Sequence, residues 1–146
     1  DEDETAALYL KTVDALNALG LKQYEISNFA KDGFESRHNL KYWELASYLG
    51  IGKSAHSFWN GRRFYYDKDF NLIPDGDGGS DEERIMLGLR LSKGIEKSLL
   101  KKPYEQFIKM GLMTQNENRV ALTPNGMLVS NTIISSLLTS NFPSFT

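Results

Sequence analysis

The first 70 residues carry helix and strand signals that cannot close a sheet by themselves. Residues 5–19 place apolar side chains three and four positions apart, and Gly20 follows, which predicts an amphipathic helix with a left-handed cap. Short β-prone runs follow at 23–27 and 47–52, and the short link after the helix is typical of a return to a parallel sheet. A parallel sheet needs more strands and cover on both faces, so we expect this segment to end an α/β domain that begins before Asp1.

Two further patterns divide the chain. Asn60-Gly61 lies between aromatic-rich runs and predicts a tight β-hairpin. The glycine-rich and aspartate-rich residues 74–79 predict a linker. We therefore expect one domain at 1–73 and a second at 80–146.

The second domain follows the order helix, helix, hairpin, helix. Residues 80–83 form a capping box at the start of the first helix, and a second helix is predicted near 103–110. Residues 112–122 predict a hairpin around a polar turn, and Thr123-Pro124 begins a last helix. This order is typical of a winged-helix-like domain.

Composition excludes several classes of protein. The chain has 146 residues, 40% hydrophobic and 25% charged, as in a soluble globular protein. It has no apolar run near the roughly 20 residues that cross a bilayer, and its acidic start is unlike a signal peptide, so we expect a cytoplasmic protein. It has no cysteine, hence no disulfide, thiolate nucleophile or sulfur ligand for a metal cluster. The net charge of −2 gives no overall attraction to nucleic acid.

A glycine run and two histidines are the candidate site residues. Residues 49–54 lack the first glycine of a phosphate loop and no clear helix follows, which leaves a tight strand exit or cofactor binding by backbone amides. His38 and His56 could serve as metal or haem ligands, as general bases, or as hydrogen-bonded structural side chains. No acidic cluster accompanies them at zinc-ligand spacing, and Ser54 is too near His56 for a serine hydrolase pair.

A winged-helix domain also suggests DNA binding. The predicted helix near 103–110 carries Glu105 and few basic side chains, and the predicted wing places Glu117 beside a single Arg119. Protein–protein or intramolecular packing is therefore favoured over DNA binding for this domain.

Five stretches form a combined pattern across nearly the whole chain: YEISNFA at 24–30, SRHNLKYW at 36–43, YLGIGxxAHS at 48–57, MLGLR at 86–90 and LTPxGxxxSN at 122–131. In combination they resemble the oxygen-independent coproporphyrinogen III oxidase-like family of radical S-adenosylmethionine proteins. The His38-Asn39-x-x-Tyr42-Trp43 pattern is similar to the haem-chaperone branch more than to the dehydrogenase branch.

The resemblance implies a fold and a set of cofactors. It implies α/β plus α+β structure, in which a C-terminal segment of a partial TIM-like (β/α) barrel precedes the winged-helix-like domain. It also implies S-adenosylmethionine and a [4Fe-4S] cluster. The three-cysteine loop that holds the cluster in this family is absent here, so the chain by itself is expected to be inactive.

The resemblance further implies two sets of site residues. Strand ends at the mouth of such a barrel border the S-adenosylmethionine pocket, which assigns to it Glu25, Ile26, Asn28, Gly52, Ser54, Ala55 and His56. His38 is then expected to ligate haem iron, and Tyr42 and Trp43, with Phe34, to contact the porphyrin.

The functional hypotheses follow in order. The first is a haem chaperone that binds haem and delivers it to haem-accepting proteins. The second is a coproporphyrinogen III dehydrogenase acting by radical oxidative decarboxylation, and the third is a winged-helix adaptor or DNA-binding module. The expected partners are haem or porphyrin, haem-accepting proteins, the rest of the barrel and a second copy in a homodimer, with no nucleic acid.

Overall fold

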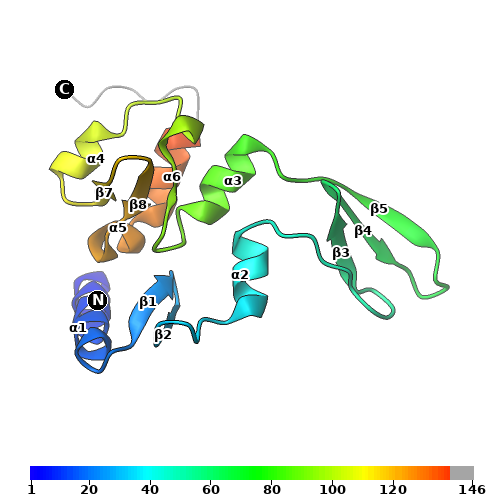
Figure 1. Ribbon diagram of the computed structural model, residues 1–146, viewed down its shortest axis with the longest axis horizontal. Helices are drawn as coiled ribbons and strands as arrows, with labels where there is room; N and C mark the ends of the chain where they lie inside the picture. Colours follow the sequence, from blue (N-terminus) through cyan, green and yellow to red (C-terminus); the bar gives the residue numbers. More distant parts are fainter. Residues whose placement is uncertain (139–146) are drawn as a thin grey trace. The chain divides into compact units, whose positions relative to one another are not determined.

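A computed structural model describes residues 1–138, and the helices and strands lie in two compact units (Figure 1). Unit 1 combines Asp1–Glu35 with the chain from Ile85 onward, and unit 2 is Ser36–Arg84. The predicted first domain, 1–73, is thus divided between both units.

Unit 1 begins with helix α1 (Glu2–Ala18) and the strand pair β1 (Lys22–Glu25) and β2 (Asn28–Ala30). The Asp1 side chain caps α1 by accepting a hydrogen bond from the Asp3 N–H. Gly20 has φ +77°, which confirms the predicted left-handed residue after the helix. Val13 on α1 is buried, and its side chain marks the inner face of the helix.

Strands β1 and β2 are antiparallel, so the prediction of a parallel strand at 23–27 is wrong. The reason is a tight turn at Ile26-Ser27 that sends the chain straight back. Glu25 is 1% exposed, and its carboxylate accepts hydrogen bonds from the Ser27 N–H at 3.2 Å and from the Asn28 side-chain amide. A local acceptor of this kind offers the backbone a turn in place of a continuing strand.

The later segments of unit 1 alternate short helices with an antiparallel sheet. Helix α3 (Asp81–Gly88) begins in unit 2 and ends in unit 1, because the boundary falls between Arg84 and Ile85. The elements that follow it are β6 (Ile95–Glu96), the 3-10 helix η1 (Lys97–Leu99), α4 (Glu105–Lys109), β7 (Met113–Gln115), β8 (Arg119–Leu122), α5 (Pro124–Leu128) and α6 (Ser130–Leu138). The strand order is β6-β8-β7. The core beneath the sheet includes Leu89, Val120 and Ile133, each at most 1% exposed.

Most local signals of this region are confirmed. Strands β7 and β8 form the predicted hairpin, and the Thr123 hydroxyl accepts a hydrogen bond from the Gly126 N–H at 3.1 Å. The Ser80 hydroxyl accepts from the Glu83 N–H at 3.2 Å, as expected of a helix cap. The prediction of a single last helix is wrong, because the helix is interrupted at Val129 and divided into α5 and α6. Strand β6 was not predicted, and the winged-helix class stays a prediction whose last residues lie outside 1–138.

The two segments of unit 1 are joined by backbone contacts. The Ser92 N–H donates to the Tyr24 carbonyl at 3.1 Å, and the Ser92 hydroxyl donates to the Gln23 carbonyl at 2.7 Å. Glu25 and Leu91 form an isolated antiparallel bridge. The β1–β2 pair is therefore tied to the segment that follows α3.

Unit 2 contains helix α2 (Arg37–Trp43) and an antiparallel sheet of β3 (His56–Trp59), β4 (Arg62–Tyr66) and β5 (Leu72–Asp77), in that order. Asn60 and Gly61 have φ of +50° and +77°, and Trp59 pairs with Arg62. Two central residues with positive φ are typical of a type I′ hairpin turn, so the predicted hairpin is confirmed.

Two sequence expectations for unit 2 are wrong. Residues 47–52 form no strand: Tyr48 makes one bridge to Phe58, and then the Gly50 N–H donates to the Ser57 hydroxyl instead of to backbone. The predicted linker 74–79 is in part strand β5. Pro74 is tolerated there because β5 is an edge strand, where a missing N–H leaves no ladder bond unmade.

The turn between β4 and β5 is held by one carboxylate. Asp67 accepts hydrogen bonds from the Asn71 side-chain amide at 3.0 Å and from the N–H groups of Asn71 and Asp69 at 2.9 and 2.8 Å. The bonds from Asn71, followed by that from Asp69, lower the pKa of Asp67 below its ordinary value.

A depressed carboxyl pKa stabilises the fold above the unfolded-state pKa, and this contribution is lost as the pH falls through the folded-state pKa. We therefore expect the turn to loosen only in acid, below the ordinary aspartate range. NMR amide shifts of Asp69 and Asn71 should move together in that range. Asp67→Asn should abolish this transition, and a transition that persists in the variant would contradict the assignment to Asp67.

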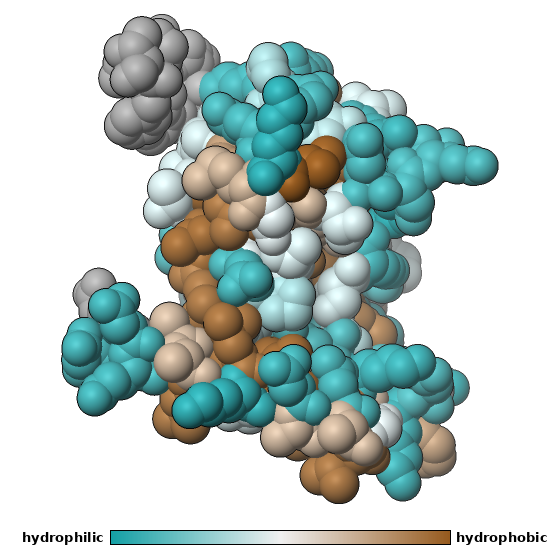
Figure 2. Space-filling view, turned by 90° about the vertical axis from the view of Figure 1, so that its left-hand side faces the viewer, coloured by the Kyte–Doolittle hydropathy of each residue, from teal (hydrophilic) through white to brown (hydrophobic). Residues whose placement is uncertain are grey.

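Large apolar side chains remain exposed in both units. In the space-filling view, apolar side chains gather among polar ones on the face shown (Figure 2). Leu8 on α1 is 66% exposed, and Leu19, the C-cap residue after the helix, is 71% exposed. In unit 1, a hollow of about 900 Å³ has Met110, Leu128 and Val129 in its wall. Among residues 1–138, no helix has the length and apolar character needed to cross a membrane.

Candidate functional site

Helix α2 places His38 and Tyr42 on one face. Ser36 begins the helix, because its hydroxyl accepts a hydrogen bond from the Asn39 N–H at 3.3 Å. Four residues apart, the Tyr42 hydroxyl and His38 Nε2 lie 3.4 Å from each other, and the ring centroids are 5.0 Å apart, edge to face. The sequence analysis assigned no helix to residues 37–43, although the Ser36 cap could have signalled one.

The chain after α2 returns Tyr48 to the same place. Leu45 has φ +54° in the corner, and the Tyr48 N–H donates to the Phe58 carbonyl at 2.7 Å. The Tyr48 ring lies 4.8 Å from Tyr42 and 6.5 Å from Phe58, centroid to centroid. A continuous row of aromatic contacts therefore connects α2 with β3.

His56 begins β3 and is held from two sides. Its Nδ1 lies 3.0 Å from Asp75 Oδ2 on β5, and its ring centroid lies 5.0 Å from that of Tyr65 on β4. The side chains of His56 and Asp75 are 57% and 43% exposed. The sheet thus fixes the imidazole orientation while leaving it accessible.

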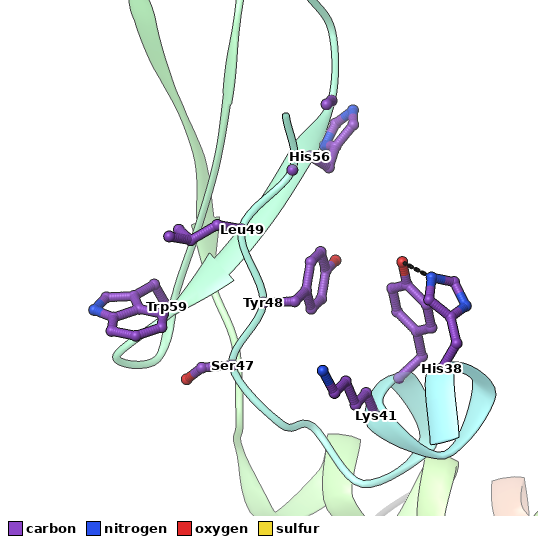
Figure 3. A pocket seen from close by; sticks show the side chains of 10 residues that line it. His38, Lys41, Ser47, Tyr48, Leu49, His56 and Trp59 are labelled. Carbon is purple, nitrogen blue, oxygen red and sulfur yellow. Dashed lines mark hydrogen bonds between the residues drawn. The ribbon is translucent and has the colours of Figure 1, made fainter. Parts of the chain in front are cut away.

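These elements enclose a hollow of about 750 Å³ (Figure 3), lined by His38, Lys41, Tyr42, Ser47, Tyr48, Leu49, Gly50, Ala55, His56 and Trp59. We call it the α2–β3 hollow. Its volume lies within the range of small-molecule and cofactor sites. Because it is built entirely from residues of unit 2, its geometry depends on that unit alone.

The lining of the α2–β3 hollow is aromatic and cationic. Among the described residues that line it, Lys41 carries a positive charge and none carries a carboxylate. Burial raises the pKa of the Tyr48 phenol, with smaller contributions from Tyr42 and Asp75 in the same direction and an opposing one from Arg63. Tyr48 therefore keeps its proton at neutral pH and offers a hydroxyl rather than a phenolate.

The structure brings part of the predicted site together. His38, Tyr42, Ala55 and His56 all line the α2–β3 hollow, although the resemblance assigns the first two to haem and the last two to S-adenosylmethionine. Gly52 lines a separate hollow of about 370 Å³ together with Phe70.

The other predicted residues lie elsewhere. Ser54 is exposed with φ +61°, and Trp43 is half-buried and outside the lining of the α2–β3 hollow. Glu25, Ile26 and Asn28 belong to the β1–β2 turn of unit 1, as described above. Phe34, also in unit 1, is 81% exposed. The assignment of all these residues to a cofactor stays a prediction.

Sequence reasoning missed four residues of this site. Lys41 lies three positions after His38 on one helix face, a spacing that only the recognition of α2 would reveal. Tyr48 and Trp59 lie in β-prone runs, and nothing in the sequence assigns either of them a role in a site. Asp75 lies 19 residues from His56, and only the register of β3, β4 and β5 brings them together.

The donor set can be compared with the ligand needs of metal groups. Among residues 1–138, no cluster of three or more His, Asp or Glu side chains could hold a bare metal ion. Zinc and similar ions need three or four protein ligands, whereas haem iron needs only axial donors because the porphyrin supplies the equatorial nitrogens. Imidazoles within an aromatic hollow fit haem. The chain has no cysteine and does not fit a [4Fe-4S] cluster.

Comparisons with known proteins match most of the chain. A family model described as the HemN C-terminal domain matches residues 82–129. The heme chaperone HemW of Bacillus subtilis (strain 168) is 31% identical over 94% of this chain and 43% of its own length. The mitochondrial radical S-adenosyl methionine domain-containing protein 1 of Mus musculus is 40% identical over 57% of this chain and 16% of its own length.

One solved structure shares the fold. It is described as "Coproporphyrinogen III oxidase (HemN) from Escherichia coli is a Radical SAM enzyme", with a TM-score of 0.56, 15% identity, and coverage of 90% of this chain and 40% of that chain. At this identity the likeness concerns the fold alone. The chain spans about two fifths of the length of both proteins: 40% of the Escherichia coli structure and 43% of the Bacillus subtilis heme chaperone.

Proposed function

Since this chain belongs to the oxygen-independent coproporphyrinogen III oxidase-like family of radical S-adenosylmethionine proteins, we propose that the complete protein is a haem chaperone and that unit 2 contributes its haem-binding surface. The observation that carries the proposal is the α2–β3 hollow. It combines two imidazoles, a row of aromatic rings and one cation in a space of about 750 Å³.

Each part of the hollow has a role toward haem. Bound haem supplies an iron centre that accepts axial ligands and can be passed to another protein. His38 supplies a nitrogen donor, and the Tyr42 hydroxyl, 3.4 Å from its Nε2, orients the ring. Tyr48 and Trp59 contact the macrocycle, and Lys41 is the cation available to a propionate carboxylate.

S-adenosylmethionine and a [4Fe-4S] cluster are part of the proposal for the complete protein. The cluster ligands lie outside this chain, which has no cysteine. The chain by itself is therefore proposed to neither assemble a cluster nor cleave S-adenosylmethionine.

The proposed partners are haem, the haem-accepting proteins and the rest of the protein's own barrel, and the proposed location is the cytoplasm. Exposed Leu8 on α1 and Leu19 at its C-cap support the barrel contact, because apolar helix surfaces of this kind are covered in complete α/β domains. A homodimer is compatible with the same surfaces.

The test is haem binding by the complete protein. We expect His38→Ala to weaken haem binding about tenfold or more, a loss near 1.4 kcal/mol or above, and to shift the Soret band. Iron-free protoporphyrin is the control, because it stacks without ligation and should bind both proteins alike. Unchanged haem affinity and spectrum in His38→Ala would reject the ligand role.

A turnover assay separates the chaperone from the dehydrogenase. The complete protein, reduced and supplied with S-adenosylmethionine, should retain haem in stoichiometric amount and leave coproporphyrinogen III unchanged. Decarboxylation of coproporphyrinogen III would instead support the enzyme, and the chaperone proposal would fail.

A further inference from the structure

His56 lines the α2–β3 hollow, and the proposed function leaves both this histidine and its hydrogen-bond partner Asp75 without an individual role. The sheet register creates this pair: His56 pairs with Tyr65, and Tyr65 pairs with Ile73, two residues before Asp75. The pairing of three strands is thus needed to bring Asp75 Oδ2 within 3.0 Å of His56 Nδ1.

Stability alone does not account for this pair. Both side chains are about half exposed, at 57% and 43%, and an exposed polar pair of this kind contributes little to stability. The strands are already held by their ladder and by the Asn60-Gly61 turn. The pair therefore orients an accessible imidazole more than it secures the fold.

The chemistry of the pair matches that of a metal-ligating histidine. Such histidines commonly donate one ring N–H to a carboxylate, which fixes the tautomer and makes the other nitrogen a stronger donor. With Nδ1–H donated to Asp75, the lone pair of His56 is at Nε2. Within the described residues, Nε2 of His56 has no hydrogen-bond partner, whereas Nε2 of His38 faces the Tyr42 hydroxyl.

His56 and His38 reach the same hollow from different elements. His38 comes from α2 and His56 from β3, with Tyr42 and Tyr48 in the same lining (Figure 3). A bare metal ion is disfavoured because no third ligand accompanies them within residues 1–138. A haem iron, by contrast, needs no more than two axial donors from the protein.

We propose that His56, oriented by Asp75, is a second axial ligand of the haem iron in the α2–β3 hollow. The proposal rests on the proposed haem-binding function and adds a ligand and its orienting carboxylate. It reassigns His56 from the S-adenosylmethionine side, and it predicts that ferric haem bound here would be six-coordinate and low-spin.

The first experiment is spectroscopic. Ferric haem is titrated into the complete protein, and its spin state is read by optical absorption and electron paramagnetic resonance. We expect wild type to be low-spin and His56→Gly to be high-spin with about tenfold weaker haem binding. Free imidazole should restore the low-spin spectrum of His56→Gly, which shows that the lost group is a ligand. A His56→Gly complex whose spectrum equals that of wild type would overturn the proposal.

The second experiment isolates the carboxylate. Asp75→Asn should still bind haem, but the weaker imidazole donor should raise the midpoint potential of the bound iron and widen the spread of the low-spin g values. Asp75→Glu should restore both. Asp77→Asn is the matched control, because it removes the same charge from the same strand without contacting His56. Equal potentials in Asp75→Asn and Asp77→Asn would refute the orienting role.

The outcomes distinguish this inference from the function on which it rests. If His38→Ala alters the haem spectrum and the His56 and Asp75 variants do not, only the second ligand is rejected. If haem fails to bind wild type at all, the proposed function is rejected as well.

Discussion

Replacing Gly94 with alanine is expected to abolish the native packing around β8. Gly94 has φ +60°, and a Cβ placed on it would lie 1.9 Å from the Val120 carbonyl oxygen and 2.6 Å from the Ala121 Cα. Both neighbours are backbone of the central strand of the β6-β8-β7 sheet, so neither can rotate away. Left-handed strain and a backbone clash together should cost about 4 kcal/mol or more, a large part of the roughly 5–15 kcal/mol that stabilises a typical domain.

Hydrogen exchange of the complete protein measures this effect locally. Amides of β7 and β8 should lose about a thousandfold in protection in Gly94→Ala, which corresponds to about 4 kcal/mol. Gly111→Ala is the matched control, because Gly111 has φ +71° but nothing within 4 Å of the place that a methyl group would occupy. The stability of Gly111→Ala should fall only by the strain of a left-handed backbone conformation with a side chain, about 1–2 kcal/mol. Equal losses in the two variants would contradict the clash.

Gly50→Ala is expected to open the α2–β3 hollow and to reduce haem binding. A Cβ at Gly50 would lie 2.4 Å from the His56 carbonyl oxygen and 2.8 Å from the Ala55 carbonyl carbon. The segment around Tyr48 would have to separate from the start of β3. This would break the hydrogen bond that the Gly50 N–H donates to the Ser57 hydroxyl. We expect a loss of about 2–4 kcal/mol in the stability of unit 2 and at least about a tenfold loss in haem affinity.

Gly52→Ala provides the comparison for this variant. Gly52 has φ +104° and nothing within 4 Å of a Cβ, so the substitution strains the backbone without a contact. Haem affinity, measured by titration of the complete protein, should stay within about threefold of wild type. If Gly50→Ala binds haem as well as Gly52→Ala does, the close approach at Gly50 is not needed for the site.

Local signals in the sequence predicted the local structure well. The positive-φ requirement at Gly20 and at Asn60-Gly61, and the hydroxyl caps at Ser80 and Thr123, depend on residues within four positions of each other. Such short-range interactions can be recognised from neighbouring residues in the sequence. The family resemblance also came from contiguous motifs.

The pairing partners of the strands could not be predicted in the same way. The run at 23–27 has the composition of a strand, but the buried Glu25 side chain folds it back on β2 in antiparallel sense. The glycine-rich 74–79 segment has the composition of a linker, yet Ile73 and Pro74 pair with β4 at the edge of a sheet. In the first case a local side-chain acceptor decided the outcome, and in the second case the pairing of β5 with β4 did.

The candidate site shows the same limit. His38 and His56 were identified from residue type and motif, and Tyr42 from the family resemblance. The meeting of His56 with Asp75 depends on two strand registers and a turn, none of which has a signature at either residue. The signal that was present and overlooked is the Ser36 cap, which would have placed Lys41 beside His38.

The assembly of unit 1 from two separated segments has a consequence during synthesis on the ribosome. Ser92 makes hydrogen bonds to the carbonyl groups of Gln23 and Tyr24, and its bond to Gln23 joins residues 69 positions apart in the sequence. All of Ser36–Arg84 must emerge before those contacts can form, so α1 and the β1–β2 pair wait as exposed, unfinished structure. Chaperone dependence and proteolytic loss of the nascent protein should therefore concentrate in residues 1–35 of this sequence until Ser92 has emerged.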